Sequence, residues 1–192
     1  MYTDKQTELD NFLKKFVPEK RLIHSAAVSE MAAKLAAIYG EDVDKARFAG
    51  MYHDIAKGFS EEDSNRLVRE FGLSGEKYFN NRAISHSKLG AAILENYFGV
   101  TDRDILDGVA NHTTGRPGMS LFEQIIFVAD ATDATRTYND VQYYRDLAEK
   151  DIDEACLEIM DFNIKHVISK GKTLDTDTIT AREYIIDKIR SR

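Results

Sequence analysis

The stretch Gly50-Met51-Tyr52-His53-Asp54-Ile55-Ala56-Lys57-Gly58 decides how the fold of this 192-residue chain is interpreted. At its centre an imidazole and a carboxylate are adjacent, and both are metal ligands in proteins. A His-Asp pair alone carries little weight, because so short a motif recurs by chance. We therefore interpret it as the centre of a metal site together with further ligands, which the sequence offers between His24 and Asp130.

Composition limits the class of protein. With 43% apolar and 31% charged residues, the chain is typical of one soluble globular domain. It has no apolar run long enough to cross a membrane and no signal peptide, so we expect a cytoplasmic location and no membrane partner. The net charge of -7 argues against binding of a nucleic-acid polymer. A small anionic substrate is compatible with this charge, because metal ions and a few cationic side chains can reverse the local field.

Helical periodicity dominates the chain, which contains only two prolines. We predict an all-α fold, a single helical bundle over residues 1–192. The predicted helices cover residues 3–16, 19–39, 42–57, a short helix after Ser60 that ends near 71, 85–98, 102–112, one after Ser120 that reaches 130, 141–169 with a break near 150, and 177–192.

The predicted helix 42–57 carries the His-Asp pair and ends at Gly58, which we expect to be its C-cap. Consecutive residues of a helix diverge by roughly 100°. His53 and Asp54 can therefore reach one cluster only if the last turn is loosened or if the site holds two metals.

Two other predicted helices carry ligands towards the interior. In 19–39, His24 lies one turn before an apolar stripe that consists of Ala27, Val28, Met31, Leu35 and Ile38. The helix after Ser120 starts with a capping box to Glu123 and is apolar nearly all round, so we expect it at the centre of the fold. Asp130 near its end would be costly to bury unless a cation lies close to it.

Six potential ligands lie on or beside inward faces of the predicted helices: His24, His53, Asp54, His86, His112 and Asp130. Four imidazoles and two carboxylates suit zinc, iron, manganese or nickel. Because six ligands exceed the number that one tetrahedral ion needs, two metals fit better. The remaining histidine, His166, has no matched partner, and we expect it to be structural.

The order of these ligands resembles the HD-domain metal-dependent phosphohydrolases. The segments His53-Asp54-Ile55-Ala56-Lys57, Asn111-His112-Thr113-Thr114-Gly115-Arg116-Pro117-Gly118-Met119-Ser120 and Phe127-Val128-Ala129-Asp130 are similar to YqeK-type HD proteins. These are symmetrical bis(5'-nucleosyl)-tetraphosphatases, which hydrolyse diadenosine tetraphosphate to two ADP. The resemblance covers residues 10–188, and the segment from His112 to Ser120 is its most specific part.

The resemblance implies that the six residues bind a two-metal centre. Iron is the first choice for the metal, with manganese, nickel, cobalt and zinc as alternatives. It also implies an acid-anhydride hydrolase that uses a metal-bridging hydroxide, with Asp54 and Lys57 as catalytic residues. Lys57, Arg116 and Arg136 are the predicted phosphate contacts. Each has a structural alternative: Lys57 as a complement to a helix dipole, Arg116 as a brace of its loop, and Arg136 as a solvated side chain.

Two departures from the family pattern affect these expectations. Family members commonly have Glu-Pro where this chain has Asp133-Ala134, which puts the shape of that loop in question, whereas Ser87 in place of glycine should matter little. We also expect Ser25 and Thr113 to hydrogen-bond to ligands.

Several alternatives remain open. Other HD enzymes act on nucleoside monophosphates, deoxynucleoside triphosphates or a guanosine alarmone. A non-hydrolytic nucleotide-binding module and a di-iron protein of oxygen chemistry are the other two alternatives. The metal, the preferred nucleobase and the oligomeric state are undetermined, with a homodimer as one option.

Overall fold

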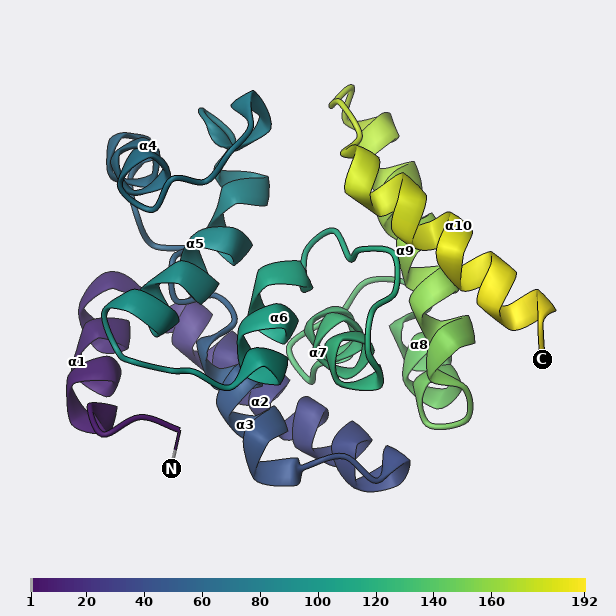
Figure 1. The fold of residues 1–192 in the computed structure, drawn as a ribbon. Coiled ribbons are helices and arrows are strands. Elements are labelled where there is room, and N and C mark those ends of the chain that lie inside the picture. The colour runs from purple at the N-terminus through teal and green to yellow at the C-terminus, as the bar shows by residue number, and fades with distance from the viewer. Residues whose placement is uncertain (1) are drawn as a thin grey trace.

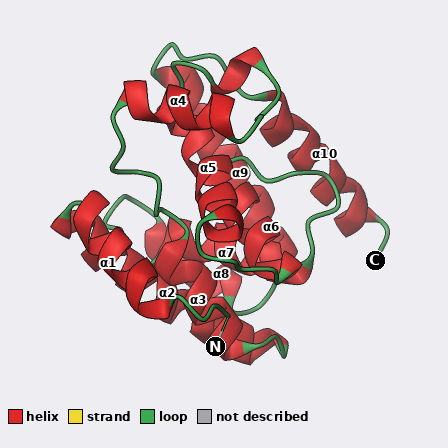
Figure 2. Cartoon of the chain, turned by 60° about the vertical axis from the view of Figure 1, so that its left-hand side comes forward, coloured by secondary structure: helices red, strands yellow, loops and turns green. Residues whose placement is uncertain are grey.

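The computed structural model describes residues 2–192, and all regular secondary structure in that range is helical (Figure 2). This confirms the all-α prediction. The elements are α1 (Gln6–Phe16), α2 (Glu19–Tyr39), α3 (Val43–Tyr52), α4 (Glu61–Glu70), the 3₁₀ turn η1 (Glu76–Tyr78), α5 (Arg82–Asn96), α6 (Arg103–Asn111), α7 (Leu121–Thr132), α8 (Val141–Ala148), α9 (Ile152–Ser169) and α10 (Thr176–Arg190).

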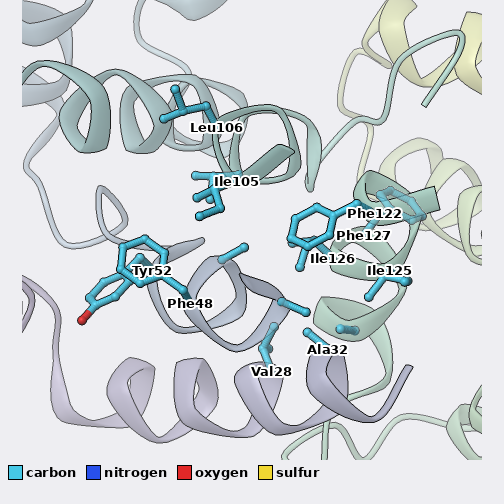
Figure 3. Packing of buried hydrophobic residues seen from close by; sticks show 14 of the residues in the cluster. Val28, Ala32, Phe48, Tyr52, Ile105, Leu106, Phe122, Ile125, Ile126 and Phe127 are labelled. Carbon is cyan, nitrogen blue, oxygen red and sulfur yellow. The ribbon is translucent and has the colours of Figure 1, made fainter. Parts of the chain in front are cut away.

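Helix α7 lies at the centre of the fold, as its apolar sequence predicts. It contacts α2, α3, α6, α8 and α9. In Figure 1 it lies between α1, α4 and α5 on one side and α8, α9 and α10 on the other. Ile125 and Ile126 are fully buried, and Figure 3 shows them in the apolar core beside side chains of α2, α3 and α6. The predicted capping box is present, with Ser120 and Glu123 satisfying each other's backbone N–H groups.

Helices α2 and α3 pack closely because of a glycine. A Cβ at Gly50 would lie 2.8 Å from the Cα of Ser29, closer than side chains approach a backbone. On α2, Val28 and Leu35 are fully buried and His24 points inward, which confirms most of the predicted stripe. Ile38 is an exception, because its side chain is 44% exposed near the end of α2.

Helix α3 ends at Tyr52, so the prediction that it reaches Lys57 is wrong. The chain continues in tight turns, where the N–H of Ile55 donates to the carbonyl of Tyr52 (3.1 Å). Gly58 is not a left-handed C-cap either. Its role is steric, because a Cβ there would lie 1.6 Å from the carbonyl oxygen of Phe16 at the end of α1. The loosened turn that His53 and its neighbour require is therefore present.

Other boundaries differ by a few residues from the predicted ones. Helix α5 begins at Arg82 and ends at Asn96, earlier than predicted, and α6 ends at Asn111, which leaves His112 just beyond it. The break between α8 and α9 confirms the one predicted near Lys150. None of the described helices combines the length and apolar character needed to span a bilayer.

The close crossing of α2 and α3 generates a stability prediction for Gly50→Ala. In an ordinary helix this change stabilises by up to about 1 kcal/mol. Here α2 and α3 must separate to admit the methyl group, so the free energy of unfolding should fall by about 1–3 kcal/mol. Urea denaturation of the two proteins measures the difference. An equal or higher free energy of unfolding in the variant would show that the crossing adjusts without cost.

Candidate metal centre

The fold brings the four predicted histidine ligands together from different elements. His24 comes from α2, His53 from the turn after α3, His86 from α5 and His112 from the end of α6. The ring centroids are 5.2 Å apart for His24 and His53, 4.9 Å for His53 and His112, and 5.1 Å for His86 and His112. All four side chains are buried. The imidazoles therefore form one continuous cluster inside the bundle.

Three of these rings are oriented by backbone carbonyls about one helical turn earlier in the chain. In each case Nδ1–H donates to the carbonyl, which leaves a lone pair on Nε2 for a metal. The pairs are His53 with Gly50 (2.7 Å), His112 with Val109 (2.7 Å) and His86 with Arg82 (3.0 Å). In each case the histidine and the carbonyl that orients its ring come from the same stretch of chain.

The Asp54 carboxylate lies between two groups of imidazoles. Its Oδ1 is 3.3 Å from Nε2 of His86 and 3.7 Å from Nε2 of His112. Its Oδ2 is 3.7 Å from Nε2 of His53. Because each oxygen faces a different group, this carboxylate is placed to connect two ligand sets.

Asp130 and Asp133 both contact His24. Oδ1 of Asp130 is 3.0 Å from Nε2 of His24 and 3.7 Å from Nε2 of His53. Oδ2 of Asp133 is 3.2 Å from Nδ1 of His24, and Asp133 is fully buried. From the sequence, Asp133 was expected only to depart from the family pattern. Its position three residues after Asp130, on the same side of the chain, could have indicated that it orients His24.

The chemistry of these residues fits a metal. Two groups of three, His24 with His53 and Asp130, and His53 with Asp54 and His112, hold their ligand atoms within 4.8 Å of one another. Nε2 of His24 and Nε2 of His53 are buried, and neither makes a hydrogen bond within residues 2–192. Buried polar atoms normally have a partner, and a cation of the iron, manganese or zinc type would provide it.

The surroundings lower the pKa of some of these residues and raise the pKa of others. Burial would raise the pKa of Asp54, but the imidazoles that face it and the Lys57 ammonium hold it well below its ordinary value. Burial, with the charge of Lys57, lowers the pKa of His86 to about 4, so this ring is neutral and ready to bind a metal. Burial opposes a charge on His24 as well, but the carboxylates of Asp130 and Asp133 beside the ring outweigh it and raise the pKa of His24 to about 9.

A cavity of about 1000 Å³ opens on the metal centre. Three cationic side chains line it near the ligands: Arg21, Lys57 and Arg136. Nη1 of Arg21 is 3.0 Å from Asp54, and Nη2 of Arg136 is 2.6 Å from Asp130. Nζ of Lys57 is 2.9 Å from Nε2 of His86. Arg21 was not predicted from the sequence, although it lies three residues before His24 on the same helix.

Arg116 lies elsewhere. Its guanidinium makes two bonds to the buried carboxylate of Glu123, at 2.7 and 2.8 Å, and approaches Asp107 at 3.7 Å. It is not among the residues that line the cavity. This geometry matches the bracing role that the sequence left open for it.

Ser25 and Thr113 were both predicted to hydrogen-bond to ligands, and the structure shows such a contact only for Thr113. The Thr113 hydroxyl is 3.2 Å from Nε2 of His86, so the predicted contact is present. The Ser25 hydroxyl is buried without a hydrogen-bond partner in the described part of the chain, so no contact with a ligand is seen. The expectation that His166 is structural is not supported, because it is exposed and lines the cavity. Its partner, one turn earlier on α9, is the ring of Phe162.

Comparison with known proteins gives consistent matches. A family model described as HD domain matches residues 21–135. The chain is 31% identical over 174 residues to the "Bis(5'-nucleosyl)-tetraphosphatase, symmetrical" of Bacillus subtilis (strain 168), a match that covers 91% of this chain and 94% of that relative. A relative with the same description from Staphylococcus aureus (strain NCTC 8325 / PS 47) is 35% identical over 173 residues, with 89% of each protein covered.

A solved structure shares the whole fold. It is described as a predicted HD superfamily hydrolase involved in NAD metabolism from Clostridium acetobutylicum, and its TM-score is 0.91 at 37% identity. The match covers 95% of this chain and 97% of the other.

The raised pKa of His24 predicts that metal binding is coupled to proton release. Because the pKa of His24 is raised from 6.5 to about 9, the ring stays protonated in the metal-free protein at pH values where an ordinary histidine is neutral. A metal can bind Nε2 only after that proton leaves. Loading at about pH 7.5 should therefore release about one proton from this ring. Calorimetry in buffers of different ionisation enthalpy measures it.

Asp133→Asn tests the cause of this proton release. The variant removes one of the two carboxylates that raise the pKa of His24, so fewer protons should be released at the same pH. Metal affinity should fall by up to about 10- to 100-fold, because the residue that orients the ring loses its negative charge. Equal proton release by both proteins would contradict the assignment to His24.

Proposed function

Since the chain belongs to the HD-domain family and, over 91% of its length, to the symmetrical bis(5'-nucleosyl)-tetraphosphatases, we propose that it is a hydrolase of diadenosine tetraphosphate. It consumes one water and cleaves the bond between the two central phosphates, which yields two ADP. The observation that carries this proposal is the position of Asp54. Its two oxygens face separate imidazole groups at the floor of a cavity with three cationic side chains.

The proposal includes two metal ions. The residues that would hold them are His24, His53 and Asp130 on one side and His86 and His112 on the other, with Asp54 shared. Nitrogen and carboxylate donors suit iron, the metal we favour, and also manganese, nickel, cobalt and zinc. A bound metal pair lowers the pKa of water and neutralises charge on a phosphate.

The side chains of the protein bind and orient the polyphosphate. Lys57 and Arg136 line the cavity beside the ligands and can donate charge-assisted hydrogen bonds to phosphate oxygens. Burial lowers the pKa of Lys57, and a phosphate beside it would favour the charged ammonium. Arg21 supplies a third cation on the same floor. These three groups would decide which phosphorus lies next to Asp54.

Arg116 contributes indirectly in this proposal. By holding the Glu123 carboxylate, it maintains the loop that carries Thr113, whose hydroxyl contacts His86. The predicted direct contact of Arg116 with phosphate would require it to leave Glu123.

The remaining expectations about partners belong to the same proposal. The substrate is a small nucleotide, and the net charge of -7 disfavours a nucleic-acid polymer. We retain a cytoplasmic location and the option of a homodimer as parts of the proposal.

The first test is product analysis. The metal-loaded protein is incubated with diadenosine tetraphosphate, and the products are resolved by chromatography. We expect ADP alone. AMP with ATP would indicate asymmetrical cleavage and overturn the assignment, as would no product. Parallel incubations with nucleoside monophosphates, deoxynucleoside triphosphates and a guanosine alarmone test the other HD activities, and a dependence of turnover on oxygen would point to di-iron oxygen chemistry.

The second test is Asp54→Asn, which keeps the size of the side chain and removes the charge that both imidazole groups face. We expect lower metal content and a loss of turnover of more than about 100-fold, beyond the usual cost of a supporting residue. Asp104→Asn is a matched control, because that exposed carboxylate pairs with Lys45 far from the centre. Metal content by elemental analysis and kcat would be equal in both variants if Asp54 had no role.

A further inference from the structure

Three aromatic rings line the cavity on the side of α9, away from most metal ligands. They belong to Tyr138, in the loop after α7, and to Phe162 and His166 on α9. The ring centroids of Tyr138 and Phe162 are 4.8 Å apart with an interplanar angle of 20°. Those of Phe162 and His166 are 6.4 Å apart with an angle of 17°. We call this nearly parallel series of rings the aromatic wall.

The inner end of the aromatic wall is attached to the metal centre. The Tyr138 hydroxyl donates to the carbonyl of Ala131 (2.6 Å), the residue after the ligand Asp130. Arg136, two residues before Tyr138, pairs with the Asp130 carboxylate. A phosphate next to Arg136 would therefore lie at the start of the series, and His166 lies at its other end.

The burial of the rings increases towards the metal centre. His166 is exposed, whereas Phe162 and Tyr138 are half-buried and pack against the core from one side. The rings thus form part of the cavity surface, in contrast to fully buried aromatic residues such as Phe122. Flat apolar surface beside a cationic floor matches a ligand that joins a flat ring to an anion.

A polar group accompanies the rings. Asn163 follows Phe162 on α9 and lines the same cavity. Its amide can both donate and accept, as the edge of a purine requires, and asparagine pairs well with the amino group and N7 of adenine. Stacking alone tolerates every base, so a group of this kind is needed to prefer one.

We propose that the aromatic wall is a nucleobase subsite, in which one adenine of the substrate stacks on the exposed end of the ring series and its edge faces Asn163. This inference rests on the proposed function and adds the residues that would recognise the nucleoside. The phosphates then extend from the wall past Arg136 to the metal centre. The subsite selects nucleotides over inorganic polyphosphates, which the metal ligands alone do not distinguish.

The kinetic test uses the metal-loaded protein and three variants. His166→Ala should raise KM for diadenosine tetraphosphate about tenfold, within the range for loss of one stacking partner, while kcat changes by less than about twofold. His166→Phe restores a flat ring and should return KM to near the original value. Tyr184→Ala is the control, because that tyrosine is 43% exposed on α10 and does not line the cavity. Thermal denaturation checks that each variant is folded.

Inhibitor binding separates this inference from the proposed function. ADP contains the base, and tripolyphosphate contains only the anionic part. His166→Ala should weaken ADP binding about tenfold and leave tripolyphosphate binding unchanged. Equal weakening of both would assign His166 to the phosphates, and no weakening of either would remove it from the site; both results overturn the subsite. If the original protein released no ADP from diadenosine tetraphosphate, the proposed function would fail, yet direct calorimetric titration with ADP and tripolyphosphate would still test the base subsite.

Discussion

The buried charge of Asp54 is the constraint on which the rest of the structure depends. Its side chain is 3% exposed, and a carboxylate so deep in a protein is stable only with partners on every side. Imidazoles from the turn after α3, from α5 and from the end of α6 face it, and the guanidinium of Arg21 reaches it from α2. Four separate segments must therefore meet at one point. The bundle is arranged around that meeting point, with α7 closing the remaining side through Asp130.

The backbone satisfies this constraint by ending α3 early. If the helix continued through Asp54, neighbouring side chains would diverge by roughly 100°, and only one could reach the cluster. The tight turns that replace it need close approaches at both ends, and glycine supplies them at positions 50 and 58. The carbonyl of Gly50 also orients His53. The same residue thus determines how closely α2 and α3 pack and where a ligand nitrogen points.

The sequence predicted the features that depend on local pattern. The clustering of the six candidate ligands agrees with their predicted positions on or beside inward helix faces, and the start of α7 follows from the cap Ser120. Predictions from the sequence were wrong where contacts with other helices determine the structure. The close contact of Gly58 with the end of α1 and the exposure of Ile38 both depend on how separate helices are placed.

The same limit applied to the candidate site. Arg116 was predicted to face phosphate because its loop resembles that of a family, yet Glu123 from α7 binds it. The spacing of Arg21 from His24 and of Asp133 from Asp130 could have indicated that these side chains point inward, but their partners Asp54 and His24 lie on other segments and are seen only in the structure. His166 lacked a partner among the ligands, so its position on the cavity wall could only be seen in the structure.

The altered loop after Asp130 shows how one constraint can be met by different residues. Where the family pattern expected from the sequence has Glu-Pro, this chain has Asp133-Ala134, and proline fixes its backbone angle whereas alanine does not. Here Arg145 of α8 takes over the restraint, because its guanidinium donates to the carbonyls of Thr132 (2.8 Å), Asp133 (2.6 Å) and Arg136 (3.1 Å). The loop is thus held by an adjacent helix, and Arg136 and the buried carboxylate that orients His24 stay in place without a proline.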